Sequence, residues 1–190
     1  MRSKILTAAR SLFIEHGYDG LSMREIAAAV GVSKPALYYH FRDKESLFLA
    51  ILIAFFDEIQ AIFDDLPGLT AQGRLSLLAR RIMNMPLEQR ALIRLLSQES
   101  DQLPPEARTA VLEKYKACFL SRIEALFDEG IQSGEFRLIS PHVALWALLG
   151  MLYPYTFVGI TGTHADGVAL DQAADQMLQI FFDGVKSQRG

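Results

Sequence analysis

The sequence predicts an all-α fold in which a small N-terminal helical domain precedes a larger helical body. Apolar residues recur three or four positions apart in nearly every segment, and no segment shows sustained alternation of apolar and polar residues. Gly, Pro, Ser and Thr stand between the periodic segments, where helices end and begin. A chain of 190 residues, 51% hydrophobic and 22% charged, can bury a sizeable core.

Two helices are predicted before residue 32. The first ends at Gly17, and the second begins at Ser22 and ends at Gly31, where a positive φ is expected. Ser22 and Glu25 have the spacing of a capping box. One face of the first helix comprises Ile5, Ala9, Leu12, Phe13 and His16, and the buried side of the second comprises Ile26, Ala27 and Val30.

A short third helix and a long fourth helix follow. Ser33 caps the third, and Pro35 falls in its first turn, where a missing N–H costs little. Leu37 and Phe41 are four residues apart and face inward. Asp43 caps the fourth helix. The apolar side of that helix comprises Leu47, Phe48, Ile51, Leu52, Phe55 and Ile59.

Further helices account for the rest of the chain. Pro67-Gly68 ends the fourth helix, Thr70 begins the next one, and Pro86 marks a later start. The helix that begins at Pro104-Pro105 is expected to continue to residues 130–134, which is long compared with the ~8–20 residues of typical globular helices. An uncharged helix and a final amphipathic helix complete the body.

The uncharged segment, residues 138–165, contains no Asp, Glu, Lys or Arg. About 20 apolar residues would span a bilayer. However, Pro154, His142 and Thr156 interrupt the segment, and no cluster of Lys or Arg flanks it. A helix that is apolar on all sides is also typical of a buried or subunit-interface helix, so we expect no membrane span.

Charge and cysteine usage indicate a polyanionic partner for the N-terminal part and a reducing compartment. Residues 1–50 hold seven Lys and Arg against five Asp and Glu, whereas the remainder holds twelve against seventeen. A mildly basic head on an acidic body fits a head that meets a polyanion. The single cysteine, Cys118, is expected to be an inert core residue and permits no internal disulfide. The N-terminus lacks the pattern of a signal peptide, so we predict a cytoplasmic protein.

Residues 22–41 predict a helix, a tight turn and a second helix. This is the pattern of a helix-turn-helix, whose second helix enters the DNA major groove. The outer side of the second helix then presents Lys34, Tyr38 and Tyr39. Ammonium and phenol groups can donate to phosphates, and aromatic faces can contact sugars and thymine methyl groups.

The stretch 5–52 resembles the DNA-binding head of the tetracycline-repressor (TetR) family, because many positions of AARSLFIEHGYDGLSMREIAAAVGVSKPALYYHFRDKESLF agree in one register. The resemblance implies a three-helix helix-turn-helix DNA-binding domain in residues 1–48. Residues 49–190 would form a helical ligand-binding and dimerisation domain. It also implies a homodimeric transcriptional regulator, usually a repressor, that leaves its double-stranded DNA operator when a small-molecule effector binds.

The family's DNA contacts can be carried over by position. The residues expected at base edges are Arg24, Lys34, Pro35, Ala36 and Tyr38. The residues expected at phosphates are Ser22, Ser33, Tyr39, His40 and Lys44. Two positions depart from the family: Pro35 stands where many members have Gly, and Met23 stands where some members have a hydroxyl.

The body is expected to supply both an effector site and a dimer interface. Ligand pockets are mostly apolar, and few charges lie on these faces, which favours an uncharged or lipophilic effector. The candidate effector contacts are Phe56, Met83, Leu95, Tyr115, Phe119, Trp146, Met151 and Tyr153. Small and apolar residues on the last two helices would form a four-helix bundle with a second copy. The candidate interface residues are Ala144, Ala147, Gly150, Ala173, Met177 and Phe181.

Two other classes of function are less favoured. An enzyme would need a catalytic constellation, but the four histidines are scattered, and Gly159 and Gly162 do not follow a strand as a phosphate loop would. No spacing of His, Cys, Asp and Glu suits a metal ion, and we expect no cofactor. A helical small-molecule-binding or structural protein without regulated operator binding would explain the body but leave the head unexplained.

Overall fold

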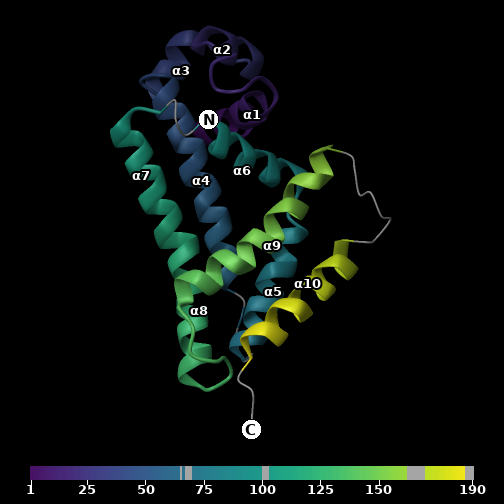
Figure 1. Cartoon of the computed structure of the whole chain (residues 1–190). Coiled ribbons are helices and arrows are strands. Elements are labelled where there is room, and N and C mark those ends of the chain that lie inside the picture. Colours follow the sequence, from purple (N-terminus) through teal and green to yellow (C-terminus); the bar gives the residue numbers. More distant parts are fainter. Residues whose placement is uncertain (65, 67–69, 100–102, 162–169, 187–190) are drawn as a thin grey trace. The chain divides into compact units, whose positions relative to one another are not determined.

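The protein is helical throughout the part that its computed structural model describes, namely residues 1–64, 66, 70–99, 103–161 and 170–186 (Figure 1). Within these residues the only strand-like pairing is an isolated antiparallel bridge between Phe136 and Lys186. The all-α prediction is therefore confirmed. The chain packs as two compact units, which are described separately: Met1–Glu58 with Glu88–Lys114, and Ile59–Leu87 with Tyr115–Gly190.

In the first unit, three short helices gather at the beginning of a long one (Figure 1). These are α1 (Arg2–His16), α2 (Met23–Val30), α3 (Lys34–His40) and α4 (Lys44–Asp64), of which the residues after Glu58 belong to the second unit. Their shared core is apolar and fully buried, because each helix turns its periodic apolar face inward. It includes Ile5, Ala9, Phe13, Ile26, Leu37, Leu47 and Phe48.

The caps predicted for these helices are present. The Ser22 hydroxyl accepts the N–H of Glu25, and the Glu25 carboxylate accepts the N–H of Ser22, so the capping box is complete. Asp43 Oδ1 accepts the N–H of Ser46 at 2.8 Å at the start of α4. Each cap pairs a backbone N–H that the first turn of a helix would otherwise leave without a partner.

The long helix predicted after Pro104 is present but contains an irregular turn. Helix α7 (Pro105–Tyr115) leads directly into a π-helical turn, η2 (Lys116–Leu120), and then into α8 (Ser121–Gln132). The sequence did not predict this π turn. A π turn inserts one extra residue into a helix and is frequent at functional sites, which directs attention to this segment.

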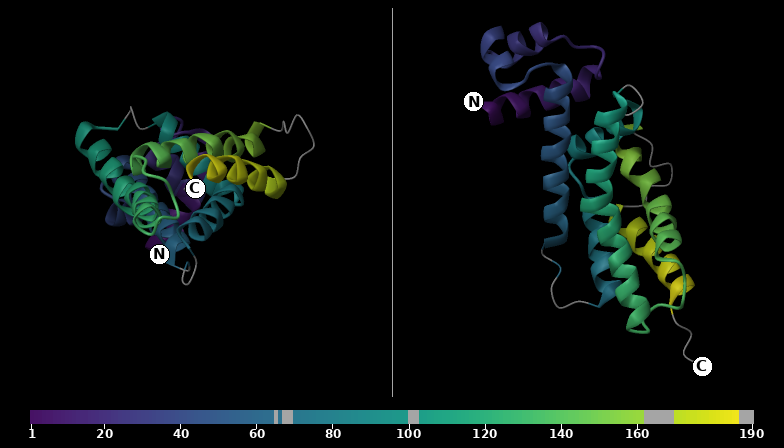
Figure 2. Two further views of the ribbon diagram at one scale, coloured as in Figure 1. Left: turned by 60° about the horizontal axis from the view of Figure 1, so that its bottom comes forward. Right: turned by 90° about the vertical axis from the view of Figure 1, so that its left-hand side faces the viewer.

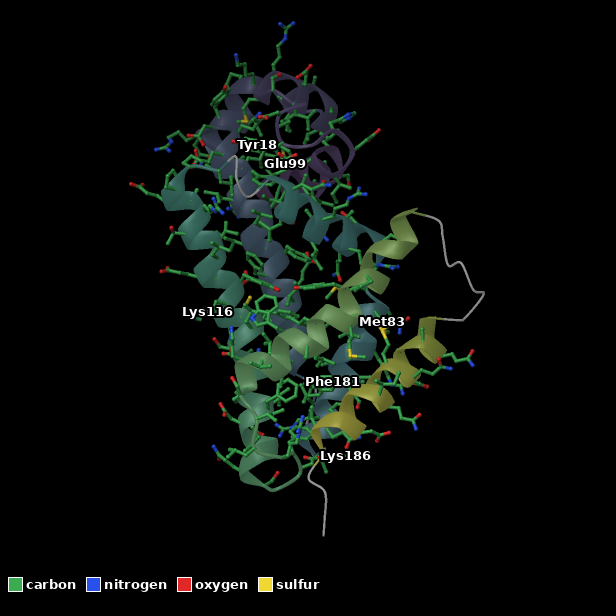
Figure 3. The ribbon with its side chains drawn as sticks, in the orientation of Figure 1. Tyr18, Met83, Glu99, Lys116, Phe181 and Lys186 are labelled. Carbon is green, nitrogen blue, oxygen red and sulfur yellow. The ribbon has the colours of Figure 1, made fainter. Side chains whose placement is uncertain are left out.

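In the second unit, α5 (Ala71–Met83), α8, α9 (Pro141–Thr161) and α10 (Leu170–Val185) pack on one another. Figure 2 shows α9 and α10 side by side in both views. Aromatic rings fill the space between α8 and α10: Phe181, labelled in Figure 3, lies 5.9 Å from Phe127 between ring centres. Thr70 caps α5 as predicted, whereas the break predicted at Pro67-Gly68 lies outside the described residues.

Among the described residues, one helix has the length and apolarity of a membrane span, and it is α4, with a mean hydropathy of 1.9. Buried residues make up 44% of its most apolar stretch. Phe48 and Leu52 of this helix are completely buried, as in the core helix of a globular protein. The uncharged segment 138–165 continues into residues outside the described part.

Candidate functional site

The turn between α2 and α3 has the geometry that a helix-turn-helix requires. Gly31 is left-handed, with φ 73° and ψ 33°, and its N–H donates to the carbonyls of Ala27 and Ala28. The N–H of Val32 also donates to the carbonyl of Ala27, at 3.0 Å. These bonds pair the last carbonyls of α2 and turn the chain sharply into α3, so that Leu37 is buried and the opposite side of α3 faces water.

None of the ten residues predicted to contact DNA is buried. Tyr39 is 86% exposed and Tyr38 is 43% exposed, so both rings are accessible to a partner. Lys34 Nζ lies 5.8 Å from the centre of the Tyr38 ring, so the charge and the ring share one patch. The exposed members are Ser22, Arg24, Ser33, Lys34, Pro35, Tyr38 and Tyr39, and the half-buried members are Ala36, His40 and Lys44.

The two serines predicted to bind phosphate differ in the hydrogen bonds that their hydroxyls make within the protein. The Ser22 hydroxyl donates to Glu25 Oε2 at 2.7 Å, and this bond is the first cause of a lowered pKa of the Glu25 carboxyl. The Ser33 hydroxyl only accepts, from the N–H of Ala36 at 3.3 Å, and has no acceptor for its own hydrogen among the described residues. Ser33 is therefore the better placed of the two to donate to a phosphate.

Lys44 has an intramolecular role that the sequence did not predict. Its Nζ donates to the carbonyl oxygen of Tyr18 at 2.9 Å and lies 4.3 Å from the centre of the Tyr18 ring. The ammonium thus joins the start of α4 to the segment that follows α1. Two of its three donor hydrogens are left by this bond, so a contact with phosphate stays a prediction.

The predicted effector contacts fall into both units. Phe56 and Leu95 are buried in the first unit, and Met83 is buried in the second. Trp146 is 44% exposed, and its indole N–H donates to His142 Nε2 at 3.2 Å on the surface of α9. Trp146 therefore lies on the surface of its unit.

Four aromatic side chains do come together at the π turn of the second unit. The hydroxyls of Tyr115 and Tyr153 are 2.8 Å apart, the Tyr115 ring stacks on Phe119 at 5.5 Å, and Phe63 meets Phe119 edge-on at 5.9 Å. We call these four residues the aromatic cluster. Burial first, then the neighbouring hydroxyl, raises the pKa of Tyr115, and burial raises the pKa of Tyr153. Both hydroxyls are therefore neutral at physiological pH.

The predicted interface residues divide between the surface and the core. Ala144, Ala173 and Phe181 are buried within their own unit and so are covered before any second copy arrives. Ala147 and Gly150 are exposed and Met177 is half-buried. The exposed apolar surface of α9 and α10 also includes two residues that were not predicted, Val143 at 64% and Ile180 at 68%.

Sequence reasoning missed several residues of interest. Phe63 and Tyr18 act through contacts with residues distant in the chain, for which a sequence contains no local signal. The pair His142 and Trp146 could have been found, since residues four apart meet on a helix. Arg90 is buried although nothing around it in the sequence predicts burial of a charge. In the part of the chain that the structure describes, no three His, Cys, Asp or Glu side chains form a possible metal site.

Comparison with known proteins places these features in a family. Residues 5–51 match the model for bacterial regulatory proteins of the tetR family, and residues 68–156 match the model for tetracyclin repressor-like C-terminal domains. The transcriptional repressor KstR2 of Rhodococcus jostii RHA1 is 25% identical over 98% of this chain and 91% of its own length.

Two solved structures are similar to this chain over nearly its whole length. A TetR-family regulator from Mesorhizobium loti MAFF303099 is 30% identical, with 97% of this chain and 96% of the other covered and a TM-score of 0.74. AibR, crystallised with isovaleryl coenzyme A and operator DNA, is 25% identical, with coverage of 95% and 97% and a TM-score of 0.78. The protein described here belongs to the TetR family of DNA-binding transcriptional regulators, as its head predicted, and not to an enzyme family.

Proposed function

We propose that the protein is a cytoplasmic homodimeric repressor that holds a two-fold symmetric operator through α3 and releases it when a small effector binds. The observation that carries the proposal is the outward face of α3, where Lys34, Tyr38 and Tyr39 stand in water on a helix fixed by its buried Leu37. A recognition helix needs this combination of a rigid inner side and donors and rings outside.

The operator contacts follow from exposure and chemistry. Arg24, Lys34 and Tyr38, with Pro35 and Ala36, would meet base edges, because they lie on the exposed part of the helix-turn-helix. Ser33, Tyr39 and His40 would meet phosphates, to which hydroxyl and imidazole N–H groups can donate. Ser22 and Lys44 would also contact phosphates, through the donor hydrogens that their intramolecular hydrogen bonds do not use.

The aromatic cluster supports an effector site at the π turn. Its rings offer apolar surface, and its paired hydroxyls offer one polar anchor, the combination that small-molecule sites use. AibR was crystallised with an acyl thioester and its operator together. We therefore propose an effector with a lipophilic or acyl portion, consistent with the apolar character of the cluster.

The exposed apolar surface of α9 and α10 supports the homodimer. Ala147 and Gly150 are small and exposed, which allows a partner helix to approach closely, and Val143 and Ile180 add apolar area. Two such helices from each subunit form a four-helix bundle, and two-fold symmetry makes the interface self-complementary.

Selection of genomic DNA fragments by the purified protein, followed by mobility shift on the recovered site, tests the proposal. We expect a palindromic site and a loss of affinity of ten-fold or more for Tyr38→Ala, because a base contact is worth about 1–3 kcal/mol. Isovaleryl coenzyme A is the first effector to test, with coenzyme A alone as the control. Selection that recovers no common sequence would contradict operator binding and favour a helical carrier.

A further inference from the structure

Arg2, the first residue of α1, has its guanidinium placed against the residue that follows α3. Its Cζ atom lies 5.2 Å from the centre of the Phe41 ring, within the range of a cation–π contact. Phe41 comes directly after the last residue of α3 and is buried, with 4% of its surface exposed, whereas Arg2 is exposed. In the first unit, a buried ring thus holds an exposed positive charge beside the end of α3.

The Phe41 ring belongs to a row of rings that leads to two of the predicted phosphate contacts. Its centre lies 6.4 Å from that of the His40 imidazole, and the His40 ring lies 5.2 Å from the Tyr39 ring. A single ring therefore separates the Arg2 guanidinium from His40. Arg2 consequently lies at the end of α3 where the side chains expected at phosphates are found.

The positive charge of Arg2 is not neutralised within the protein. Among the described residues, no carboxylate pairs with Arg2 and no group accepts a hydrogen bond from it. Asp43, two residues after Phe41, is engaged elsewhere: its Oδ2 accepts from Arg42 Nε and its Oδ1 from the N–H of Ser46, both at 2.8 Å. The five N–H donors of the Arg2 guanidinium therefore remain for a ligand.

Stabilisation of α1 does not explain Arg2. The first turn of a helix favours acidic side chains, because the N-terminal end of the helix dipole is positive. The first turn of α1 contains no acidic residue and holds both Arg2 and Lys4. A cation at this position opposes the dipole, so its charge is better explained by a negative partner outside the protein.

We infer that Arg2 is an additional contact with the DNA backbone, which extends the DNA interface from α3 to the beginning of α1. The inference rests on the proposed function, since its ligand is a phosphate of the bound DNA. Guanidinium suits this role because its planar N–H donors match two phosphate oxygens at once. Such a contact adds affinity and fixes the orientation of the head on the duplex, but it reads no base.

Three variants separate a phosphate contact from a general effect of charge. Arg2→Gln removes the charge and keeps a polar side chain, and Arg2→Lys keeps the charge without the planar fork. Lys4→Gln is the matched control, because Lys4 is an exposed cation of the same helical turn. Two residues of an α-helix differ by about 200° around its axis, so Lys4 lies on the side of α1 away from Phe41.

The test is the salt dependence of DNA binding by the full-length parent and the three variants, with any purification tag at the C-terminus. Each protein is titrated between 50 and 200 mM salt against the selected operator and against a scrambled duplex of equal length. For Arg2→Gln we expect the salt slope to fall by about 0.9 for each bound head, which weakens binding about five-fold per head at roughly 0.15 M salt. The loss should be equal on both duplexes. Arg2→Lys should keep the slope of the parent, and Lys4→Gln should change it by less than half as much as Arg2→Gln.

Thermal unfolding of the same proteins controls for folding. Because both residues are exposed, each variant should melt within about 3 °C of the parent. The inference is overturned if Arg2→Gln keeps the slope of the parent, if Lys4→Gln lowers the slope equally, or if Arg2→Lys fails to retain it. A loss confined to the selected operator also overturns it, because Arg2 would then contact a base edge.

The same titrations keep this inference distinct from operator recognition. A parent that binds both duplexes equally would contradict a specific operator, yet the slopes of the variants on either duplex would still decide the role of Arg2. A parent that prefers the selected site, with an unchanged slope for Arg2→Gln, would refute the contact at Arg2 and leave operator binding intact.

Discussion

The hydrogen bond between the hydroxyls of Tyr115 and Tyr153 makes a quantitative prediction. Replacing either tyrosine by phenylalanine keeps the ring but leaves the other hydroxyl without this partner in a buried site. A buried polar group that loses its partner costs about 1–3 kcal/mol, whereas removing both partners together is close to neutral. Tyr115→Phe and Tyr153→Phe should each destabilise the protein, and the double variant should be more stable than the sum of the two changes predicts.

Unfolding of the parent, both single variants and the double variant closes a double-mutant cycle. For a chain of this length, each 1 kcal/mol corresponds to about 2–4 °C in Tm, so the single variants should melt lower by several degrees. A coupling free energy of about 1 kcal/mol or more is expected for residues in one hydrogen bond. Additive effects of the two substitutions would refute the paired-hydroxyl geometry.

The same pair determines how stability responds to alkaline pH. Burial raises the pKa of both tyrosines above the usual value of 10.0, so at high pH the folded protein binds more protons than the unfolded chain. The stabilisation is fully present below pH 10 and is lost as the pH rises through and beyond that value. The double Phe variant should show a weaker alkaline loss of stability than the parent. Equal alkaline profiles would mean that the hydroxyls are solvated.

Three further predictions concern packing, DNA and assembly. Gly130→Ala should cost about 1–3 kcal/mol of unfolding free energy, because the added Cβ would lie 2.3 Å from the ring of Phe136; an unchanged denaturation midpoint would show that this ring yields. Lys44→Ala should lower Tm through the lost bond to Tyr18, and the salt slope of DNA binding should fall by about 0.9 if the ammonium also reaches a phosphate. Ala147→Arg should convert the dimer to monomer in analytical ultracentrifugation, because an exposed small residue becomes a buried unpaired charge; a dimer that persists would place the interface elsewhere.

The head of the protein was predictable because its signals are local. The capping box of Ser22 and Glu25, the left-handed Gly31 and the cap at Ser33 each depend on residues within a few positions of one another. These features determine where α2 and α3 begin and end, and therefore which side of α3 faces outward. The exposure of Tyr39 follows from the burial of Leu37 two residues earlier.

The body was predictable only at the level of its helices. The meeting of Tyr115 with Tyr153 joins residues 38 positions apart, and no periodicity indicates it. The π turn at Lys116–Leu120 shifts the helical register by one residue, so faces drawn on a regular helix are misplaced beyond it. On α9, apolarity on every side left the choice between core and interface open, and packing against the unit's own helices decided that Ala144 is buried.

Arg10 joins α1 to the end of α4's first-unit part and to the start of α6 (Leu87–Glu99) within the first unit. Arg10 Nη1 donates to Glu58 Oε1 at 2.7 Å, and Arg10 Nε lies 3.0 Å from Glu88 Oε1 without the alignment of a hydrogen bond. Both carboxylates are partly exposed, so these ion pairs add little stability.

At its other end, α6 places Glu99 beside Gly17, where an added Cβ would lie 3.2 Å from Glu99 Oε1; Figure 3 labels Glu99 close to Tyr18. The start of α6 therefore meets α1 at Arg10, and the end of α6 lies beside Gly17, directly after α1. An ion pair can specify such a geometry even where it contributes little energy. The match to the N-terminal family model ends at residue 51, but α1 cannot keep these contacts if α6 shifts.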